Sequence, residues 1–289
     1  MKRIGFIGFG EVGYEMSKGF KEEGNIQVIA FDPLYKESFI QNRAKEVDVT
    51  LVDQPKNVIK KVDMVIVAVP ANKTWNVWEG LKEYLKSNVL YVDVTTADAT
   101  TKQKISKEVV GEDKKFIDAA LMGPLPIYKH KVPIIASGRG VGAFVDQMGE
   151  FNMNIEKISD EVGDATNIKF VRSIFMKGMA SLLYEVLDIA DHLNVGDNVI
   201  HSISETLDSR SFEQTVTRLV SGTAIHSERR MKEMENVINL ITTNNKHAHM
   251  SKATLDKLRW ISKLGLKKHF NSKAPDDWKL VFNKINEER

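Results

Sequence analysis

Three polar residues, Lys169, Ser173 and Lys177, follow one another at four-residue intervals within the stretch from residue 163 to residue 194. This spacing places them in one row along a helix. Apolar residues recur beside the row at steps of three and four, which is the spacing of a buried helical face. A buried lysine amine has a lowered pKa and can accept a proton near neutral pH. The row is therefore a candidate site for acid–base chemistry.

Two interpretations of Lys169 compete. Its stem can run along the helix while the amine reaches water, which is the commonest arrangement of a helical lysine. Alternatively, Asp164 or Thr166 caps the helix, and Lys169 then lies near the first turn, where the helix dipole disfavours a second positive charge. Phe170 and Ile174 lie opposite the main apolar face, which predicts burial of the first half between two masses. Helix geometry alone slightly favours the first interpretation, and the N-terminal half of the chain reverses that order.

Composition limits the class of protein. The chain has 289 residues, 42% apolar and 28% charged, which suits a soluble protein of one large or two ordinary domains. A net charge of +2 implies neither nucleic acid nor a membrane as partner. The absence of cysteine excludes disulfides and thiolate chemistry, and we expect a cytoplasmic protein. We see no signal peptide, no membrane-spanning run and no cluster of metal ligands.

A glycine motif near the N-terminus predicts a dinucleotide site. The apolar run KRIGFIG ends in Gly8, Gly10 and Gly13, and a helical pattern closed by Gly24 follows. This is GxGxxG with a strand before it and a helix after it, the context that makes the motif informative. Gly8 allows a tight turn, Gly10 lets the backbone approach a pyrophosphate, and Gly13 lets helix pack on strand.

The second predicted strand, IQVIAF, ends at Asp32. A carboxylate at this point can accept hydrogen bonds from both hydroxyls of the adenosine ribose, and it repels a 2′-phosphate. The same residue also suits an Asx turn before Pro33. We therefore favour NAD, while Lys36 and Arg43 lie close enough in sequence to leave NADP open.

Further strands are predicted at MVIVAV, which Pro70 ends, NVLYVDVTT (88–96), KFIDAALMGP (115–124), VPIIASG and NIEKIS. Small polar residues at the carboxyl ends of parallel strands lie where open α/β sheets bind ligands. Thr95 and Thr96 occupy such a position. After the last strand the pattern is helical. We predict an α/β fold, with a Rossmann dinucleotide-binding domain (1–162) joined by the long helix to an all-α domain (163–289).

The helical part contains a second polar cluster, HSERRMKEME. A helix is predicted over 198–208 with Asp197 as its cap, Ser211 and Gln214 resemble a capping box, and a long helix covers about 223–243. On that long helix Arg230, with His226 one turn earlier, is closer to the buried stripe than Arg229. A last amphipathic helix begins near Trp278.

Several of these segments resemble the β-hydroxyacid dehydrogenase family, which includes 3-hydroxyisobutyrate dehydrogenase and the N-terminal domain of 6-phosphogluconate dehydrogenase. GFIGFGEVGYEM looks like the family's cofactor motif, DVTT like its strand-end motif near the nicotinamide, and FIDAALMGP like its substrate loop. GDATNIKFVRS looks like the catalytic motif. That match implies that Lys169 is the catalytic lysine and that Ser173 replaces the family's asparagine.

The chain departs from the family at several positions. Met122, Gly123 and Pro124 stand where the family's substrate loop carries serine and two glycines, so a serine hydroxyl for the substrate carboxylate is lost. Arg172 stands where true 6-phosphogluconate dehydrogenases carry histidine. The HSERRMKEM run, with the MKG after Lys169, resembles a phosphogluconate-dehydrogenase-like subgroup with a shorter helical domain.

We predict an NAD(P)-dependent dehydrogenase that transfers a hydride between nicotinamide and a small hydroxy acid or related alcohol. Lys169 is the expected general acid and base, and Ser173 the expected orienting group. An imine reductase on the same fold is an alternative, although such enzymes generally lack this lysine. A non-catalytic NAD-sensing protein is another, since it would tolerate Met122 and Pro124.

The predicted contacts form two sets. Those with the cofactor are Gly8, Phe9, Gly10, Glu11, Val12, Gly13, Asp32, Val69, Pro70 and Thr95. Those with a small anionic substrate are Thr96, Met122, Gly123, Lys177, His226 and Arg230. We also expect a homodimer formed through the helical domain, because the long helix carries more apolar surface than so small a domain can cover.

Overall fold

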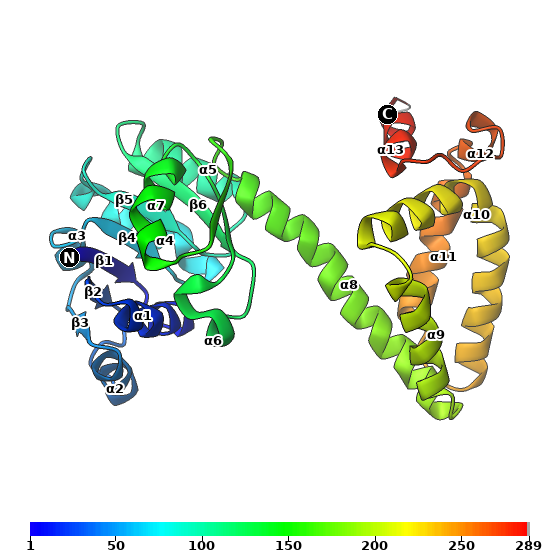
Figure 1. Cartoon of the computed structure of the whole chain (residues 1–289), viewed down its shortest axis with the longest axis horizontal. Coiled ribbons are helices and arrows are strands. Elements are labelled where there is room, and N and C mark those ends of the chain that lie inside the picture. Colours follow the sequence, from blue (N-terminus) through cyan, green and yellow to red (C-terminus); the bar gives the residue numbers. More distant parts are fainter. Residues whose placement is uncertain (288–289) are drawn as a thin grey trace. The chain divides into compact units, whose positions relative to one another are not determined.

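A computed structural model describes residues 1–287 of the chain (Figure 1). It contains two compact units, Met1–Ser173 and a second that begins at Ile174. Helix α8 runs from Asp164 to His192, so the division between the units falls inside one continuous helix. The long helix expected over residues 163–194 is thus confirmed almost to its ends.

The first unit is built on one eight-stranded sheet with the order β3-β2-β1-β4-β5-β6-β7-β8. The strands are β1 (Lys2–Ile7), β2 (Ile26–Phe31), β3 (Val49–Leu51), β4 (Met64–Val67), β5 (Leu90–Asp93), β6 (Lys115–Leu121), β7 (Ile134–Ser137) and β8 (Ile155–Ser159). All neighbours are parallel except β6 and β7. Of these strands only β3 was not predicted, because a run of three residues is too short to show a pattern.

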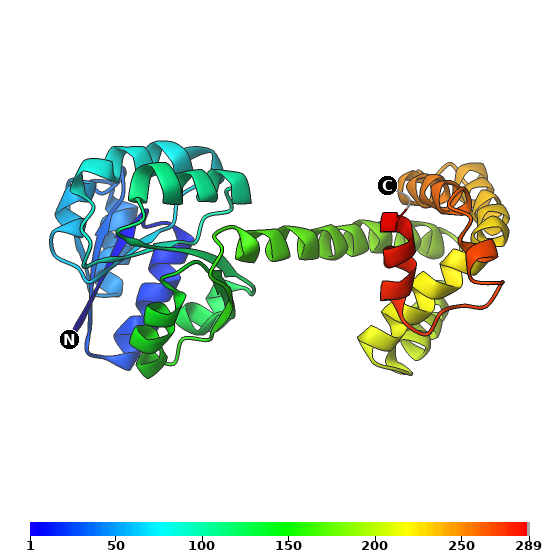
Figure 2. The same cartoon turned by 90° about the horizontal axis from the view of Figure 1, so that it is seen from above.

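Helices cover both faces of this sheet, as connections between parallel strands require. They are α1 (Glu11–Glu23), α2 (Ser38–Glu46), α3 (Pro55–Ile59), α4 (Thr74–Leu81), α5 (Ala99–Lys104) with its continuation η3 (Ile105–Val110), α6 (Leu125–Tyr128) and α7 (Val141–Met148). Short turns are η1 (Ala71–Lys73), η2 (Lys82–Tyr84), η4 (Lys129–Lys131) and η5 (Gly149–Phe151). Figure 2 shows α3, α4 and α5 on one face and α1 and α7 on the other.

The apolar core is divided by the sheet into two layers. Phe20 of α1 and Phe144 of α7 belong to one layer, and Trp78 of α4 and Val109 of η3 to the other. All four residues of the central strand β4 are buried, which explains its continuous apolar run. The strand order reverses between β1 and β4, and the carboxyl ends of strands at such a point are where open α/β sheets bind their ligands.

The second unit is entirely helical within the described chain. It contains the end of α8 and the helices α9 (Gly196–Asp208), α10 (Phe212–Thr243), α11 (His249–Ser262), α12 (Leu266–His269) and α13 (Trp278–Glu287). Its small core joins α10, α12 and α13 through Ala224, Leu266, Val281 and Ile285. Glu185 of α8 accepts hydrogen bonds from the N–H groups of Met250 and Ser251 at 2.7 and 2.8 Å, and it thereby caps α11.

The helix starts in this unit differ in part from expectation. The capping box of Ser211 and Gln214 is confirmed. However, α10 begins directly after it at Phe212 rather than near residue 223, because Gly222 is tolerated inside the helix at a cost of about 1 kcal/mol. Helix α9 begins at Gly196, and no side chain among residues 1–287 caps it, so the expected cap by Asp197 is wrong.

Candidate functional site

The loop between β1 and α1 places three glycines in different surroundings. Gly8 has a φ of +94°, and a Cβ atom there would lie 2.3 Å from the carbonyl oxygen of Ala68. A Cβ atom at Gly13 would lie 3.0 Å from the Gly8 oxygen, where helix and strand approach closely. At Gly10, a Cβ atom would meet nothing within 4 Å in the described chain. Gly8 and Gly13 thus serve the turn and the packing, whereas Gly10 borders open space, as pyrophosphate binding requires.

The first turn of α1 is open. No side chain in the described part of the chain caps it. The N–H of Tyr14 donates to the Gly10 oxygen at 3.0 Å, so the N–H groups of Glu11, Val12 and Gly13 come before the first bond of the helix. Such N–H groups at the positive end of a helix dipole bind phosphate. This turn therefore fits the diphosphate of a dinucleotide.

The carboxylate of Asp32 joins the end of β2 to the glycine loop. Its Oδ2 accepts from the N–H of Phe9 and its Oδ1 from the N–H of Leu34, both at 2.9 Å. The second bond is the Asx turn expected across Pro33. Because each carboxylate oxygen can accept a further hydrogen bond, Asp32 can still receive ribose hydroxyls.

An apolar hollow of about 200 Å³ lies beside the same loop. Gly8, Pro33 and Val69 line it from the ends of β1, β2 and β4, and Asn76 of α4 adds one amide. A small apolar slot next to a diphosphate site fits an adenine ring. Pro70, the other residue expected after β4, immediately precedes η1.

The turn after β5 is held by Asp93. Its Oδ1 accepts from the N–H of Thr95 at 2.9 Å and from the Thr95 hydroxyl at 2.7 Å, while its Oδ2 accepts from the indole N–H of Trp78 at 2.6 Å. Thr95 is buried and Thr96 is exposed. The Thr95 hydroxyl is therefore committed to Asp93, and Thr96 is the residue of this pair whose side chain reaches solvent.

The chain after β6 turns at Met122 and Gly123. The N–H of Met122 donates to the carbonyl oxygen of Pro133 at 2.8 Å. The N–H of Gly123 has no hydrogen-bond acceptor within residues 1–287. Of these two backbone groups, only that of Gly123 can bind an anion.

His130 and Lys131 tie the returning limb of this loop to α1. The His130 ring is 1% exposed, and its Nε2 lies 3.2 Å from a carboxylate oxygen of Glu23 and 3.0 Å from the carbonyl oxygen of Phe151. Lys131 Nζ lies 2.8 Å from the same Glu23 oxygen. The loop is thus held against the helix whose first turn fits the diphosphate.

The buried contact of His130 predicts that the folded protein loses stability in mild acid. Burial lowers the pKa of His130, although the Phe151 carbonyl and Glu23 favour the charged ring. The unfolded chain therefore takes up a proton at His130 that the folded chain resists, and stability falls as the pH drops below about 6.5. We expect the urea midpoint to decrease between about pH 7 and pH 5, and to decrease less in His130→Gln, which cannot take up this proton. Equal pH dependence in both proteins would contradict this role.

Side chains of the sheet hold the start of α8. The N–H of Ala165 donates to the Ser137 hydroxyl at 3.1 Å, and the N–H of Thr166 donates to Asp118 Oδ2 at 2.9 Å. The Thr166 hydroxyl donates to Asp118 Oδ1 at 2.8 Å. Neither Asp164 nor Thr166 is therefore the cap that the sequence suggested, because β6 and β7 supply the acceptors instead.

Lys169 lies within one turn of this anchored start, and Ser173 follows one turn later. Both side chains are half-buried. Ile168, Phe170 and Val171 are 40, 40 and 67% exposed. The expected burial of the helix on two faces is thus absent in the first unit, where Thr166 is the last fully buried residue of α8.

Lys177, His226 and Arg230 belong to the second unit. Helix α10 is kinked at His226, whose φ and ψ are −114° and 18°. The half-buried Arg230 reaches back across the kink and donates to the Thr223 hydroxyl. Arg229 is exposed and pairs with Glu233, so the predicted difference in exposure between the two arginines is confirmed, whereas His226, which was expected to accompany Arg230, is exposed. Burial, together with repulsion from Arg229, lowers the pKa of Arg230.

Three residues that organise this site were not predicted from the sequence: Lys102, Asp118 and Ser137. Lys102 is completely buried, between Asp93 and Asp118. A lone carboxylate within the apolar run FIDAAL was a signal for Asp118. Lys102 lies in the polar run TTKQK, which carries no sign of burial.

Residues 1–287 contain neither a membrane-spanning helix nor a cluster of metal ligands. Every helix there is too short or too polar to cross a bilayer. Over the same residues, histidine and carboxylate side chains do not gather in threes around a point where a metal ion could bind.

Known protein families match both parts of the chain. Residues 3–139 match the NAD binding domain of 6-phosphogluconate dehydrogenase. Residues 190–261 match a domain of unknown function, DUF1932. An uncharacterized 28.5 kDa protein of Methanothermus fervidus is 32% identical over 259 residues, which are 90% of this chain and 98% of that protein.

An enzyme of known activity and a solved structure are also similar. Glyoxylate/succinic semialdehyde reductase 1 of Arabidopsis thaliana is 24% identical over 212 residues, or 69% of this chain and 70% of the reductase. An imine reductase of Streptomyces aurantiacus superposes with a TM-score of 0.74 over 98% of this chain and 99% of that one. At 15% identity, this second likeness concerns the fold alone.

Proposed function

Because this chain belongs to the β-hydroxyacid dehydrogenase family, we propose that it is an NAD(P)-dependent oxidoreductase that uses Lys169 as general acid and base on a small hydroxy acid or related alcohol. One arrangement supports the proposal most. Asp118, which binds the first turn of α8, is paired in the sheet with Asp93, the last residue of β5. The helix that carries Lys169 therefore begins beside the edge where parallel strands bind a nicotinamide cofactor.

The proposed chemistry needs one proton transfer from the protein. In oxidation, the unprotonated amine of Lys169 takes the proton of the substrate hydroxyl while the hydride leaves the same carbon. In reduction, the amine returns the proton to the forming alkoxide. Ser173, one helical turn away, orients the hydroxyl or the amine through a hydrogen bond. The bound nicotinamide supplies the acceptor or donor of the hydride.

We propose that NAD is the preferred cofactor. Asp32 is held by two backbone N–H groups at the point where the ribose of an adenosine binds in this fold. A fixed carboxylate there accepts ribose hydroxyls and repels a 2′-phosphate. Lys36 and Arg43 keep NADP as the alternative, although each already lies over a tyrosine ring of its own domain.

We propose candidates in each unit, taken separately, for binding the anionic end of the substrate. In the first unit, the N–H of Gly123 and the exposed Thr96 lie at the ends of β6 and β5. In the second, Lys177, His226 and Arg230 are the candidates. Of these three residues Arg230 has the strongest support, because a half-buried guanidinium can donate two parallel hydrogen bonds to one carboxylate.

We also propose a homodimer formed through the second unit. Ile200, Ile203 and Leu207 of α9 are 44, 36 and 48% exposed and recur at steps of three and four, so that they share one helical face. An exposed apolar face of this kind marks an interface. Sedimentation equilibrium at micromolar concentration should give twice the mass of one chain. A single-chain mass would contradict the proposal.

Two alternatives have observations in their favour. An imine reductase has the same fold, but Lys169 then needs another explanation. An NAD-sensing protein would keep the glycine loop and Asp32 and would tolerate the changed substrate loop at Met122. Turnover separates the three: a dehydrogenase oxidises hydroxy acids, an imine reductase reduces cyclic imines, and a sensor does neither.

The deciding experiment is calorimetric titration of the full chain with NADH and NADPH, followed by a screen of small hydroxy acids and cyclic imines that monitors nicotinamide absorbance. We expect tighter binding of NADH, and oxidation of at least one hydroxy acid. Tighter binding of NADPH would contradict the assignment of Asp32. Binding of neither cofactor would refute the whole proposal.

A further inference from the structure

We propose that Lys102 is a positioning residue for the reaction. Through Asp93 and Asp118, it holds two parts of the site together: the turn after β5, which carries Thr95, and the first turn of α8, which leads to Lys169. Lys102 itself is 0% exposed, so it cannot touch a substrate. The inference rests on the proposed function of Lys169.

The ammonium group of Lys102 lies between carboxylates of two adjacent strands. Its Nζ is 2.7 Å from Asp118 Oδ1 and 3.1 Å from Asp93 Oδ1, and it also donates to the carbonyl oxygen of Asp93 at 3.4 Å. All three side chains are fully buried. Asp93 and Asp118 are direct partners in the sheet register, so one cation serves both carboxylates.

Each carboxylate uses its other bonds to hold a different segment. Asp93 accepts from the N–H and hydroxyl of Thr95. Asp118 accepts from the N–H and hydroxyl of Thr166, three residues before Lys169. A shift of the Asp93 carboxylate therefore moves the turn at the cofactor edge. A shift of the Asp118 carboxylate moves the helix that carries the proposed acid–base group.

The charges explain why the lysine is needed. Burial by itself lowers the pKa of Lys102, but the two carboxylates outweigh this effect and the pKa is raised, so the amine stays charged. Without it, two neighbouring buried carboxylates would repel each other, and one would take up a proton. A protonated Asp118 would have fewer acceptor sites for the N–H and hydroxyl of Thr166.

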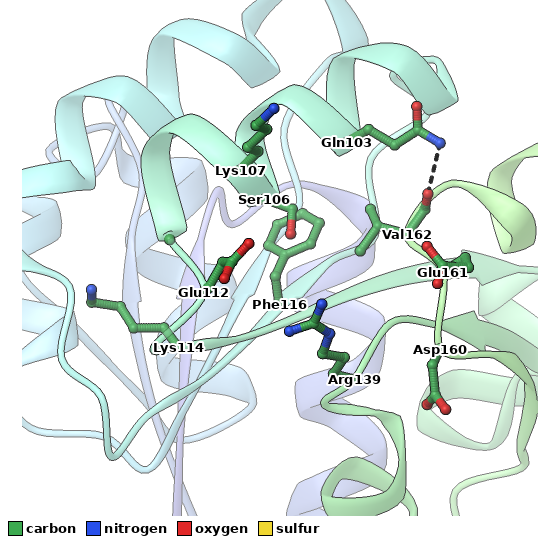
Figure 3. Close-up of a pocket in the computed structure, with 11 residues that line it drawn as sticks. Gln103, Ser106, Lys107, Glu112, Lys114, Phe116, Arg139, Asp160, Glu161 and Val162 are labelled. Atoms are coloured by element: carbon green, nitrogen blue, oxygen red, sulfur yellow. Dashed lines mark hydrogen bonds between the residues drawn. The ribbon is translucent and has the colours of Figure 1, made fainter.

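Helix α5 also holds the segment before α8 by a separate contact. Gln103, next to Lys102, donates from its Nε2 to the carbonyl oxygen of Val162 at 3.0 Å, on the wall of a hollow of about 320 Å³ (Figure 3). This bond is exposed and involves no charge, whereas the Lys102 contacts are buried and ionic. Gln103→Ala is therefore a control that removes an exposed contact of the same helix without touching Asp93 or Asp118.

The test compares Lys102→Met with a double variant, Lys102→Met with Asp118→Asn. The double variant keeps the net charge of the three buried side chains at positions 93, 102 and 118. The amide oxygen introduced at position 118 still accepts from the Thr166 N–H. Hydrogen exchange followed by mass spectrometry reports on residues 160–172, while kcat, KM and the NADH dissociation constant are measured on the same samples. In case Lys102→Met fails to fold, Thr166→Val removes one bond to Asp118 without any change of charge.

For Lys102→Met we expect exchange in the first turn of α8 to rise about tenfold or more relative to the other helices. We expect kcat to fall by roughly 10- to 100-fold with little change in KM or NADH affinity. The double variant should recover part of both losses, Thr166→Val should show the same changes at smaller size, and Gln103→Ala should leave kcat unchanged.

A variant that only unfolds at lower urea concentration, with normal kcat and unchanged relative exchange in α8, would overturn the proposal. If Thr166→Val left hydrogen exchange at the start of α8 unchanged, the proposal would also be overturned. Exchange needs no substrate, so it tests the positioning role even in a wild-type protein without turnover. Absence of wild-type turnover would instead refute the proposed function.

Discussion

Replacement of Lys169 by methionine is expected to lower turnover by about 10²- to 10⁴-fold and to leave the affinity for NADH unchanged. Methionine keeps most of the unbranched stem but can neither take nor give a proton. The residues proposed to bind the cofactor lie after β1, β2, β4 and β5 and in the first turn of α1, and none of them is on α8. Steady-state absorbance of the reduced nicotinamide measures kcat, and calorimetric titration measures binding.

Lys107→Met is a suitable control, because Lys107 is an exposed lysine of η3 in the same unit. We expect this variant to retain wild-type turnover. If Lys169→Met also turned over normally, Lys169 would not be the acid–base group, and the sensor or imine reductase alternative would gain support. Loss of both turnover and NADH binding would point to a structural role for Lys169 instead.

The second large effect is expected for Gly10→Asp, which should weaken NADH binding by roughly 100-fold or more, about 3 kcal/mol. Gly10 stands at the N-cap position of α1, where aspartate is a favoured residue. Its carboxylate would accept from the open N–H groups of the first turn and would repel a diphosphate. The backbone has a φ of −76°, and the Cβ atom meets nothing within 4 Å in the described residues, so folding should be unaffected.

Gly142→Asp provides the matched control. Gly142 is exposed in the first turn of α7, and a Cβ atom there also meets nothing within 4 Å in residues 1–287. The same substitution at this site should leave NADH binding intact. Urea unfolding should show Gly10→Asp to be at least as stable as the wild type. Wild-type affinity in Gly10→Asp would mean that the cofactor does not lie on this turn.

Local patterns were sufficient to predict much of the first unit. Strand β4 is a continuous apolar run because it is buried on both faces. The glycine loop is recognised by the spacing of its glycines between a predicted strand and a predicted helix. The Asx turn of Asp32 and the capping box of Ser211 and Gln214 act within a few residues of their own position. Such features depend on nearest neighbours in the chain, so the sequence contains all the information they need.

Family resemblance added the interpretation of Lys169, which helix geometry alone did not favour. The resemblance depends on short motifs at strand ends, where the parallel sheet gathers residues from distant parts of the chain. The kink of α10 at His226 was not predicted, although Ser221 and Gly222, a serine–glycine pair of the kind that accompanies kinks, lie about one turn before it. The kink is what lets Arg230 reach Thr223.

By itself, then, the sequence determined seven of the eight strands, the long helix α8, the glycine loop and the carboxylate at the end of β2. Only the tertiary structure decided that Lys102 is buried between Asp93 and Asp118, and that Asp118 rather than a residue of α8 holds the start of that helix. These contacts depend on the register of β5 against β6 and on the path of α5 across the sheet. A buried charge is stable only where groups of opposite charge surround it. These groups come from distant parts of the chain, so no local pattern of residues predicts that they meet.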